Sequence, residues 1–458
     1  MKSRNLYVRF GAVALMMALA LAGCDGSGAK EPTETAVSTE SSSEAGTQES
    51  QTEESGSGAA TKESTVEPKE TATPAPTPSA EEVYEDMVVR SLNYAGNNYR
   101  LKKVMEKMRA GEKVRIGILG GSVTEGAGAG SNDKGYAYQF VEEFGKTYGV
   151  NPDEQIIYVN AGLSGTPSVL GLMRYQQDIL DPLGEAPDLL IIEFAVNDWQ
   201  EATSGRAYES LVYEALKAKE DAAVICLCSV AKTAWNTQDV YLPIVKAYQI
   251  PLVSLKDAVF ENNNKTRVSA TTYFMDDYHP KLYGHKLMKD CLMNLFARAD
   301  EEAADEPAEI PEAAVKGRDF IGMKQIDSSS KVKNLKTGNF GETDDKVVQE
   351  YFTKKASFPN NFHHPAESAN QPFTLKLKCK KIIINYKTAN DKNFGKADFY
   401  IDGKLVASAD GFSSGGWNNC NVLMILDDAQ AATHTLEVSM NDESKDKAFT
   451  ILSISYVE

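Results

Sequence analysis

The feature that most constrains the fold is a regular alternation of short apolar runs and longer amphipathic stretches. The apolar runs are 114–119, 155–160, 188–195, 223–229 and 251–254, and the helix-compatible stretches are 136–148, 168–180, 205–219, 241–248 and 281–298. Near-continuous apolar strands that alternate with helices are typical of a parallel sheet covered on both faces. The sequence therefore predicts a three-layer α/β domain over residues 82–299.

The remainder of the chain has a different pattern. Residues 300–314 are rich in Asp and Glu and contain two prolines, which predicts an acidic linker. Residues 315–458 hold β-branched and aromatic runs at 373–386, 397–408, 422–426, 435–439 and 449–457. Within the run 397–408, Asp402-Gly403 between residues 400–401 and 404–406 is a strong hairpin signal. We expect a C-terminal β-sandwich, jelly-roll-like, over 315–458.

The first 24 residues predict export. Lys2, Arg4 and Arg9 precede an apolar run over 10–22, which is the layout of a secretory signal peptide and too short to span a bilayer comfortably. The run ends in Leu-Ala-Gly-Cys24, which resembles the lipobox of bacterial lipoproteins. Lipidation of Cys24 would anchor the protein to the bacterial cell membrane, on the extracytoplasmic side. A plain signal peptide with an incidental cysteine is the alternative.

Residues 25–80 predict a disordered acidic stalk. They hold eleven Asp or Glu, three Lys, no aromatic residue and only two valines as branched aliphatics, so they cannot bury enough apolar surface to fold. The whole chain has 48 Lys and Arg against 65 Asp and Glu, a net charge of −17. A polyanion of this kind is repelled by phosphate backbones, which argues against nucleic acid as a partner.

Five cysteines remain besides Cys24. Cys226 and Cys228 lie in an apolar run and are expected to be buried small hydrophobes. A bridge between Cys379 and Cys420 stays open, because spacing alone cannot decide it. No cluster of His, Cys and Asp has the spacing of metal ligands, so we expect neither a metal nor a cofactor.

A glycine-flanked serine follows the first strand of the predicted sheet, in Gly120-Gly121-Ser122-Val-Thr-Glu-Gly126. Open α/β sheets place their ligand sites at such carboxyl ends of strands. The stretch lacks the glycine or lysine that phosphate-binding loops require. Taken alone, Ser122 is equally a helix cap in a tight turn or a nucleophile.

A nucleophilic serine needs a base, usually an imidazole that a carboxylate orients. Of the five histidines, three fall in the β-rich part, which leaves His279 and His285. His279 stands in Asp276-Asp-Tyr-His279-Pro between the last strand and the last helix, with Asp276 three residues away. His285 lies on the following helix and is interpreted as a structural or surface residue.

Two further turns suit the stabilisation of an oxyanion, which needs preformed donors. The second strand is followed by Asn160-Ala-Gly-Leu-Ser-Gly165, which can present a backbone N–H, and the third by Asn197, which can present a side-chain amide. Each residue alone is more often a turn former or helix cap. Four such signals in order at strand ends point to acyl transfer.

These four segments, in this order, resemble the SGNH/GDSL hydrolase superfamily, whose members are flavodoxin-like α/β/α esterases and lipases. The resemblance implies Ser122 as nucleophile and Asp276 with His279 as the rest of the triad. It further implies that the oxyanion hole is formed by the backbone N–H of Ser122 with Gly165 and Asn197.

Two positions depart from the family pattern. Gly121 replaces an Asp that is not a triad member, and Ala195 replaces a Gly in the block around Asn197. The methyl group of Ala195 is expected to narrow the pocket or to alter the turn, with the donor at Asn197 retained.

The resulting prediction is an extracellular serine esterase that removes short acyl groups, most plausibly acetyl, from carbohydrate. A lipase, thioesterase or acyltransferase on the same site is the alternative among enzymes. A non-catalytic glycan-binding lipoprotein is the alternative of another class, in which Trp417 stacks on sugar unless it packs in the core. Trp199 either faces the substrate or packs in the core. Glu193 lies inside an apolar strand, and the sequence gives no role for it.

Overall fold

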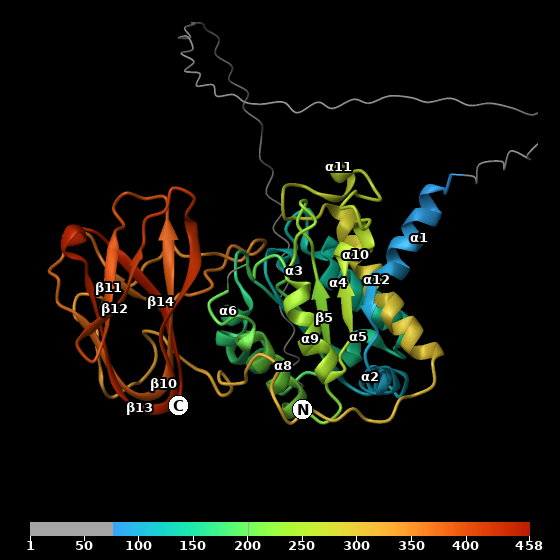
Figure 1. Ribbon diagram of the computed structural model, residues 1–458, viewed down its shortest axis with the longest axis horizontal. Coiled ribbons are helices and arrows are strands. Elements are labelled where there is room, and N and C mark those ends of the chain that lie inside the picture. The colour runs from blue at the N-terminus through green and yellow to red at the C-terminus, as the bar shows by residue number, and fades with distance from the viewer. Residues whose placement is uncertain (1–76, 200) are drawn as a thin grey trace, which may run out of the picture. The chain divides into compact units, whose positions relative to one another are not determined.

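The computed structural model describes residues 77–199 and 201–458, all within one compact unit. The predicted signal peptide, Cys24 and nearly all of the predicted stalk lie outside these residues. Within the described ranges, no helix combines the length and the apolar character that crossing a membrane requires. An α/β domain comes first along the chain and a β-sheet domain follows it (Figure 1).

The first sheet has six strands in the order β1-β6-β5-β4-β2-β3. All pairs are parallel except that β1 runs antiparallel to β6. The five predicted apolar runs all form strands, whereas β1 was not predicted because only three residues pair. The bounds are β1 Leu92–Tyr94, β2 Val114–Gly120, β3 Ile156–Gly162, β4 Leu189–Glu193, β5 Ala223–Cys228 and β6 Leu252–Ser254.

Alternate residues of the central strands enter two separate cores, one on each face of this sheet. Ile116 and Ile191 belong to the core that α2, α4 and α12 complete, whereas Leu190 and Ile192 belong to the core of α6, α8 and α9. Burial on both faces explains why these strands read as continuous apolar runs, each such side chain contributing about 1.5–3 kcal/mol. The α/β domain is therefore the predicted three-layer, flavodoxin-like fold.

The helices cover both faces. One predicted helix, 168–180, is interrupted: α6 ends at Met173 and a π-helical turn over Gln176–Leu180 follows. Arg174, between them, donates hydrogen bonds from its side chain to carbonyls at the strand ends. The bounds are α1 Ala80–Arg90, α2 Tyr99–Arg109, α3 Ser122–Glu125, α4 Tyr136–Tyr148, α5 Pro152–Gln155, α6 Ser168–Met173, α7 Asp181–Leu183, α8 Arg206–Ala218, α9 Gln238–Tyr248, α10 Leu255–Val259, α11 Ala270–Tyr273 and α12 Leu282–Glu301.

The C-terminal domain is a connected antiparallel sheet along the path β12-β11-β13-β10-β14-β7, with β8 paired to β10 and β9 to β14. Its strands are β7 Lys324–Ile326, β8 Leu335–Lys336, β9 Phe362–His364, β10 Phe373–Ala389, β11 Lys396–Ile401, β12 Lys404–Asp410, β13 Trp417–Met440 and β14 Phe449–Val457. The predicted hairpin is present, and both Asp402 and Gly403 have positive φ, 52° and 78°, as a type I′ turn requires.

One strand prediction in this domain is wrong in its bounds. The runs 422–426 and 435–439 are parts of the single strand β13, because Asp427 and residues 432–434 between them pair with β10, while residues 428–431 stay extended without a partner in the register. The register between β10 and β13 shifts at three places, which lets the long strands bend.

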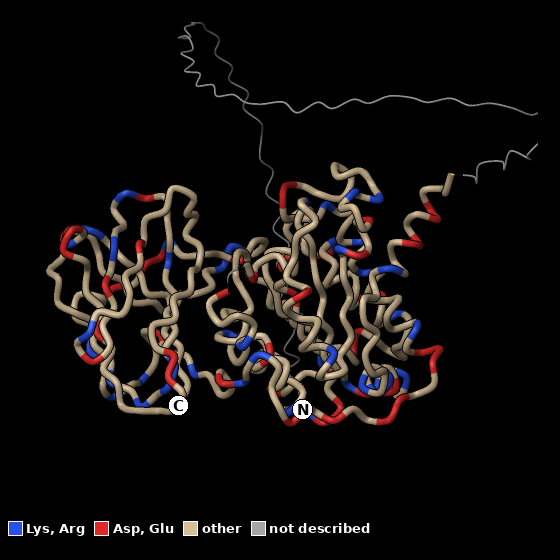
Figure 2. The backbone as a smooth tube through the Cα atoms, in the orientation of Figure 1, with Lys and Arg blue, Asp and Glu red and all other residues tan. Residues whose placement is uncertain are grey.

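Residues 302–323 contain no helix or strand, yet they are bonded to the α/β domain. Asn98 donates its side-chain amide to the Ala303 carbonyl, and the Glu209 carboxylate accepts backbone N–H groups of residues 315–317. Basic and acidic residues are interspersed along both domains (Figure 2), and Arg206 pairs with Asp319 and Asp427 at 2.7 and 2.8 Å. These bonds attach the C-terminal domain to the α/β domain.

The cysteines of the described residues are all free thiols. Cys226 and Cys228 are buried in β5, as expected for small hydrophobes, with sulfur atoms 3.7 Å apart. Cys379 and Cys420 are also buried and form no bridge, because their strands place them opposite Ala432 and Lys387.

Candidate active site

The predicted site residues follow the ends of three neighbouring strands. Gly120, the last residue of β2, lies in register with Gly162 at the end of β3 and with Glu193 at the end of β4. Ser122 begins α3 directly after β2. The sheet therefore brings the turns that carry Ser122, Gly165 and Asn197 to one edge.

The structure joins Ser122, His279 and Asp276 in a chain of hydrogen bonds. His279 Nε2 lies 2.8 Å from Ser122 Oγ, and His279 Nδ1 lies 2.7 Å from Asp276 Oδ2. Ser122 is 7% exposed. This arrangement suits a serine that a neighbouring base activates.

The turn that carries His279 is held by its own carboxylate. Asp276 Oδ1 accepts the N–H groups of Tyr278 and His279 at 2.8 and 2.9 Å. Burial opposes ionisation of Asp276, but these bonds and the His279 side chain outweigh it and hold the pKa of Asp276 below its usual value. Asp276 therefore stays charged and orients the imidazole.

Three donors are predicted for the oxyanion hole. The N–H groups of Ser122 and Gly165 have no acceptor in the part of the chain that the structure describes. Gly165 has a φ of +71°, which explains the glycine in this turn. Asn197 Oδ1 is buried 2.3 Å from where a methyl group on Gly121 would lie, so a larger residue at position 121 would require the Asn197 side chain to shift.

Asp198 ties two of these turns together. Its Oδ1 accepts the N–H of Ser168 at 2.7 Å, and its Oδ2 accepts the Tyr241 hydroxyl at 2.6 Å. Burial, with a smaller contribution from the charge of Glu201, raises the pKa of Asp198 to about 7. Asp198 thus links the Asn197 turn to the segment that follows Gly165.

The sequence gives no account of Glu193. In the structure its carboxylate bonds the short helix α3 that Ser122 begins. Glu193 is fully buried and accepts hydrogen bonds from Thr124 at 2.9 Å and from Ser229. Thr124 lies in α3, two residues after Ser122, and also bonds the Tyr136 hydroxyl at 2.8 Å. The sequence signal for this role is a single acidic residue in an otherwise apolar strand, at the strand end that precedes the Asn197 turn.

Arg174 was missed, and its position within a helical pattern gave no signal. It is 2% exposed and donates to the carbonyls of Gly120 at 2.8 Å and Ala161 at 2.6 Å. The guanidinium therefore fixes the ends of β2 and β3, from which the serine turn and the Gly165 turn depart.

His285 and Ala195 lie outside the candidate site. His285 is buried, accepts the N–H of Tyr136 at 3.2 Å and contacts the Ala127 carbonyl at 2.9 Å. Burial lowers the pKa of His285 to about 4, so it is a neutral structural residue. The expectation that the Ala195 methyl narrows the pocket is wrong, because Ala195 is buried in the core of α6, α8 and α9.

Two tryptophans are exposed and lie outside both cores. Trp199 is 70% exposed and contacts Trp235 edge to face at 6.3 Å between ring centroids. Trp417, at the start of β13, is 50% exposed, and its ring lies 3.0 Å from where a methyl group on Gly165 would be. A cavity of about 380 Å³ runs beside this contact and is lined by Ser164, Val348 and Trp417 among others. The C-terminal domain thus contributes an aromatic wall next to the predicted oxyanion turn.

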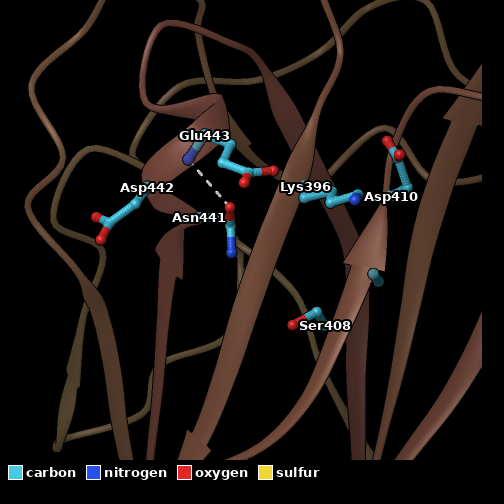
Figure 3. A pocket seen from close by; sticks show the side chains of 7 residues that line it. Lys396, Ser408, Asp410, Asn441, Asp442 and Glu443 are labelled. Atoms are coloured by element: carbon cyan, nitrogen blue, oxygen red, sulfur yellow. Dashed lines mark hydrogen bonds between the residues drawn. The ribbon is translucent and has the colours of Figure 1, made fainter.

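A second cavity, of about 540 Å³, lies in the C-terminal domain (Figure 3), and none of the predicted site residues lines it. Its lining is polar and charged, with Lys396, Asp410 and Glu443 among the residues, and it holds no aromatic side chain. Across residues 77–199 and 201–458, no group of three His, Cys, Asp or Glu is placed to hold a metal ion.

Comparison with known proteins supports this assignment of the α/β domain. Residues 118–287 match the GDSL-like lipase/acylhydrolase family. No curated protein sequence matches the chain. A crystal structure of a two-domain esterase active on acetylated mannans is similar at 25% identity and a TM-score of 0.69, covering 81% of this chain and 99% of that one. The same kind of esterase co-crystallised with mannopentaose is similar at 24% identity and a TM-score of 0.68, covering 81% and 98%. The chain is thus an esterase of the SGNH/GDSL hydrolase superfamily with a second, C-terminal β-sheet domain.

Proposed function

We propose that the protein is an extracytoplasmic, lipid-anchored carbohydrate esterase that removes acetyl groups from a polysaccharide. The observation that carries the proposal is the Ser122–His279–Asp276 chain of hydrogen bonds. A cavity lined by Ser164 and Trp417 lies next to the Gly165 turn.

In the proposed mechanism, His279 Nε2 takes the proton from Ser122 Oγ as the oxygen attacks the ester carbonyl carbon. Asp276 keeps the other ring nitrogen protonated and stabilises the imidazolium. The developing oxyanion accepts hydrogen bonds from the N–H groups of Ser122 and Gly165 and from the Asn197 amide.

The tetrahedral intermediate then collapses. The carbonyl re-forms, the bond to the sugar oxygen breaks, and His279 gives its proton to that oxygen. Water next attacks the carbonyl carbon of the acetyl-serine and gives a proton to His279. When the second tetrahedral intermediate collapses, the bond from that carbon to Ser122 Oγ breaks and His279 returns the proton to Oγ, which releases acetate and restores Ser122.

Two observations support a carbohydrate substrate: the similarity to the two-domain esterase and the exposed Trp417 ring. The two-domain esterase described above as active on acetylated mannans shares both domains with this chain. The apolar face of a sugar ring packs well on an exposed aromatic ring, and Trp417 presents such a ring beside Gly165. Acetylated mannan is therefore the first substrate to test, with acetylated xylan as the comparison.

The location is proposed from the sequence alone. The apolar run over 10–22 and the following Cys24 support lipidation and a place outside the cytoplasm. Replacing Cys24 with alanine is expected to release the protein from the membrane fraction, and retention of the Cys24→Ala variant would refute the lipid anchor.

The deciding experiment measures acetate released by the detergent-solubilised full chain from acetylated mannan, acetylated xylan and p-nitrophenyl acetate. We expect activity on a polysaccharide and on the small ester, both abolished in Ser122→Ala. Trp417→Ala should raise KM for the polysaccharide by about tenfold. Leu405→Ala is the matched control, because Leu405 on β12 is equally exposed, at 50%.

The other outcomes separate the alternatives. Activity on p-nitrophenyl acetate alone would keep the serine mechanism and exclude a polysaccharide substrate. Preference for p-nitrophenyl octanoate would indicate a lipase. A folded protein with no activity, whose glycan binding survives Ser122→Ala, would identify a binding protein instead.

A further inference from the structure

Glu125 is a buried carboxylate that the proposed mechanism does not use. It is the last residue of α3, the helix that Ser122 begins, and it is 6% exposed. Burial raises the pKa of Glu125, whereas hydrogen bonds from Ser164 and Tyr351 oppose that increase. A carboxylate is kept in such a place only when hydrogen-bond donors offset its desolvation, so its donors indicate its role.

The three donors to Glu125 come from two different parts of the molecule. Glu125 Oε2 accepts the N–H of Ser164 at 2.9 Å and its hydroxyl at 2.5 Å, and Oε1 accepts the N–H of Tyr351 at 2.5 Å. Ser164 directly precedes Gly165, whereas Tyr351 belongs to the C-terminal domain. One side chain therefore joins the nucleophile helix, the predicted oxyanion turn and the second domain.

The C-terminal domain also packs directly against two glycines, one at the end of α3 and one in the Ser164–Gly165 turn. A methyl group on Gly126 would lie 2.9 Å from the Phe352 ring, and one on Gly165 would lie 3.0 Å from the Trp417 ring. Both glycines have positive φ, 102° and 71°, so any other residue would be strained as well as crowded. The second domain thus touches the segments on either side of the Glu125 carboxylate.

We propose that Glu125 is a positioning residue through which the C-terminal domain fixes the Ser164–Gly165 turn, and with it the oxyanion donor at Gly165. The proposal rests on the proposed function. A donor stabilises the oxyanion only when held at about 2.7–3.1 Å from it, so a small shift of the turn costs rate. Because the oxyanion forms only in the transition state, the effect belongs in kcat rather than KM.

The first test is Glu125→Gln in the full chain, assayed with p-nitrophenyl acetate. The variant keeps the shape, but its amide nitrogen must face an N–H donor of Ser164 or Tyr351. We expect kcat to fall by about 10- to 100-fold with KM within about twofold. Glu125→Asp keeps the charge on a shorter side chain, so its kcat should lie between that of the wild type and that of Glu125→Gln.

A matched control distinguishes this role from a general loss of stability. Gln155 is also buried, and it bonds Val150, Asn151 and Met108 at the opposite end of the sheet. Gln155→Glu is expected to lower the melting temperature at least as much as Glu125→Gln and to leave kcat of the folded enzyme unchanged.

The second test addresses the link to the C-terminal domain. Tyr351→Pro removes the N–H donor, whereas Tyr351→Ala removes the ring and keeps the donor. We expect the proline variant to lose about tenfold in kcat and the alanine variant to stay within about twofold. Combined with Glu125→Gln, the proline should add little, because both act through one hydrogen bond.

The outcomes distinguish this proposal from the proposed function. An inactive wild-type protein would refute the proposed function. A wild-type enzyme that Ser122→Ala inactivates, with kcat normal in Glu125→Gln, would refute only the role of Glu125. Additive losses in the double variant would remove the C-terminal domain from the proposal. If Tyr351→Pro does not fold, the series Glu125→Gln, Glu125→Asp and Gln155→Glu decides the role of Glu125.

Discussion

The two edges of the parallel sheet both bury charged groups, but they use them differently. At the edge where the strands begin, Asp188 is 3% exposed and pairs with Lys107 and Lys219, each at 2.7 Å. Its other oxygen accepts the N–H of Arg115 at 2.8 Å. Burial opposes ionisation, but these bonds outweigh it and hold the pKa of Asp188 below its usual value. Both oxygens of this carboxylate are therefore satisfied by donors.

At the edge where the strands end, the buried carboxylates accept hydrogen bonds from neutral donors instead of lysines. Burial raises the pKa of Glu125, Glu193 and Asp198. The N–H groups of Ser122 and Gly165 meet no acceptor among the residues described. Unused donors cost stability, and they are what an oxyanion site requires. The difference teaches that changes at one edge should alter rate and changes at the other should alter stability.

The largest effect should come from His279→Ala at the strand ends. Without the base, kcat for p-nitrophenyl acetate is expected to fall by about 10⁴-fold or more, with little change in melting temperature. The matched control is His434→Ala, because His434 also bonds an Asp, Asp402, at 2.8 Å, but in the C-terminal domain. Equal losses in the two variants would contradict the assigned triad.

Asn197→Ala should have the next largest effect. Removal of one oxyanion donor is expected to lower kcat by about 10²- to 10³-fold and to leave KM nearly unchanged. Gly121→Ala places a methyl group against the Asn197 amide and should lower kcat less. If Gly121→Ala still reduced kcat in the Asn197→Ala background, its effect would not pass through that amide.

At the opposite edge, Asp188→Asn should change stability and spare the rate. The variant leaves two partly buried lysines without their carboxylate, and we expect the free energy of unfolding to fall by about 2 kcal/mol. Asp300→Asn, which breaks the more exposed pair with Arg109, should cost about 0–1 kcal/mol. Denaturant titration measures both. A loss of kcat in folded Asp188→Asn would erase the distinction between the edges.

The same contrast explains what the sequence could predict. Strand positions of the α/β domain were predictable because burial on both faces leaves an uninterrupted apolar signal, as in β4 and β5. Asp276 and His279 were predictable because they stand three residues apart in a turn with few competing histidines. The site residues that could be predicted are those whose partners lie close in the sequence, or whose turn follows a strand.

The supports of the site were not predictable for the opposite reason. Glu125 meets Tyr351 across 226 positions, and Arg174 meets Gly120 across 54. No local pattern encodes such a pairing, since an acid at a helix end or a basic residue in a helix has many uses. The bounds of β13 failed similarly, because Asp427, Thr433 and His434 pair with residues of β10 that lie far from them in the sequence.

The smallest effect, and the one that separates the edges by sign, is the dependence of stability on pH. Asp198 has a pKa of about 7 in the folded protein, well above its ordinary value of 3.8. The folded state therefore holds this proton longer than the unfolded chain, and stability falls as pH rises from about 4 to 7. The pKa of Asp188 is lowered, so its stabilisation is present above about pH 4 and is lost as pH falls further.

Melting temperatures between pH 2.5 and 8 should show these opposite signs as shifts of about 2–4 °C. Relative to wild type, Asp198→Asn should gain stability as pH rises from 4 to 7, because it lacks the group whose ionisation is unfavourable. Asp188→Asn should instead lose stability relative to wild type as pH rises towards 4, and the deficit should then stay constant. If both variants drifted from wild type in the same direction over the same range, the two edges would not differ in how they hold their carboxylates.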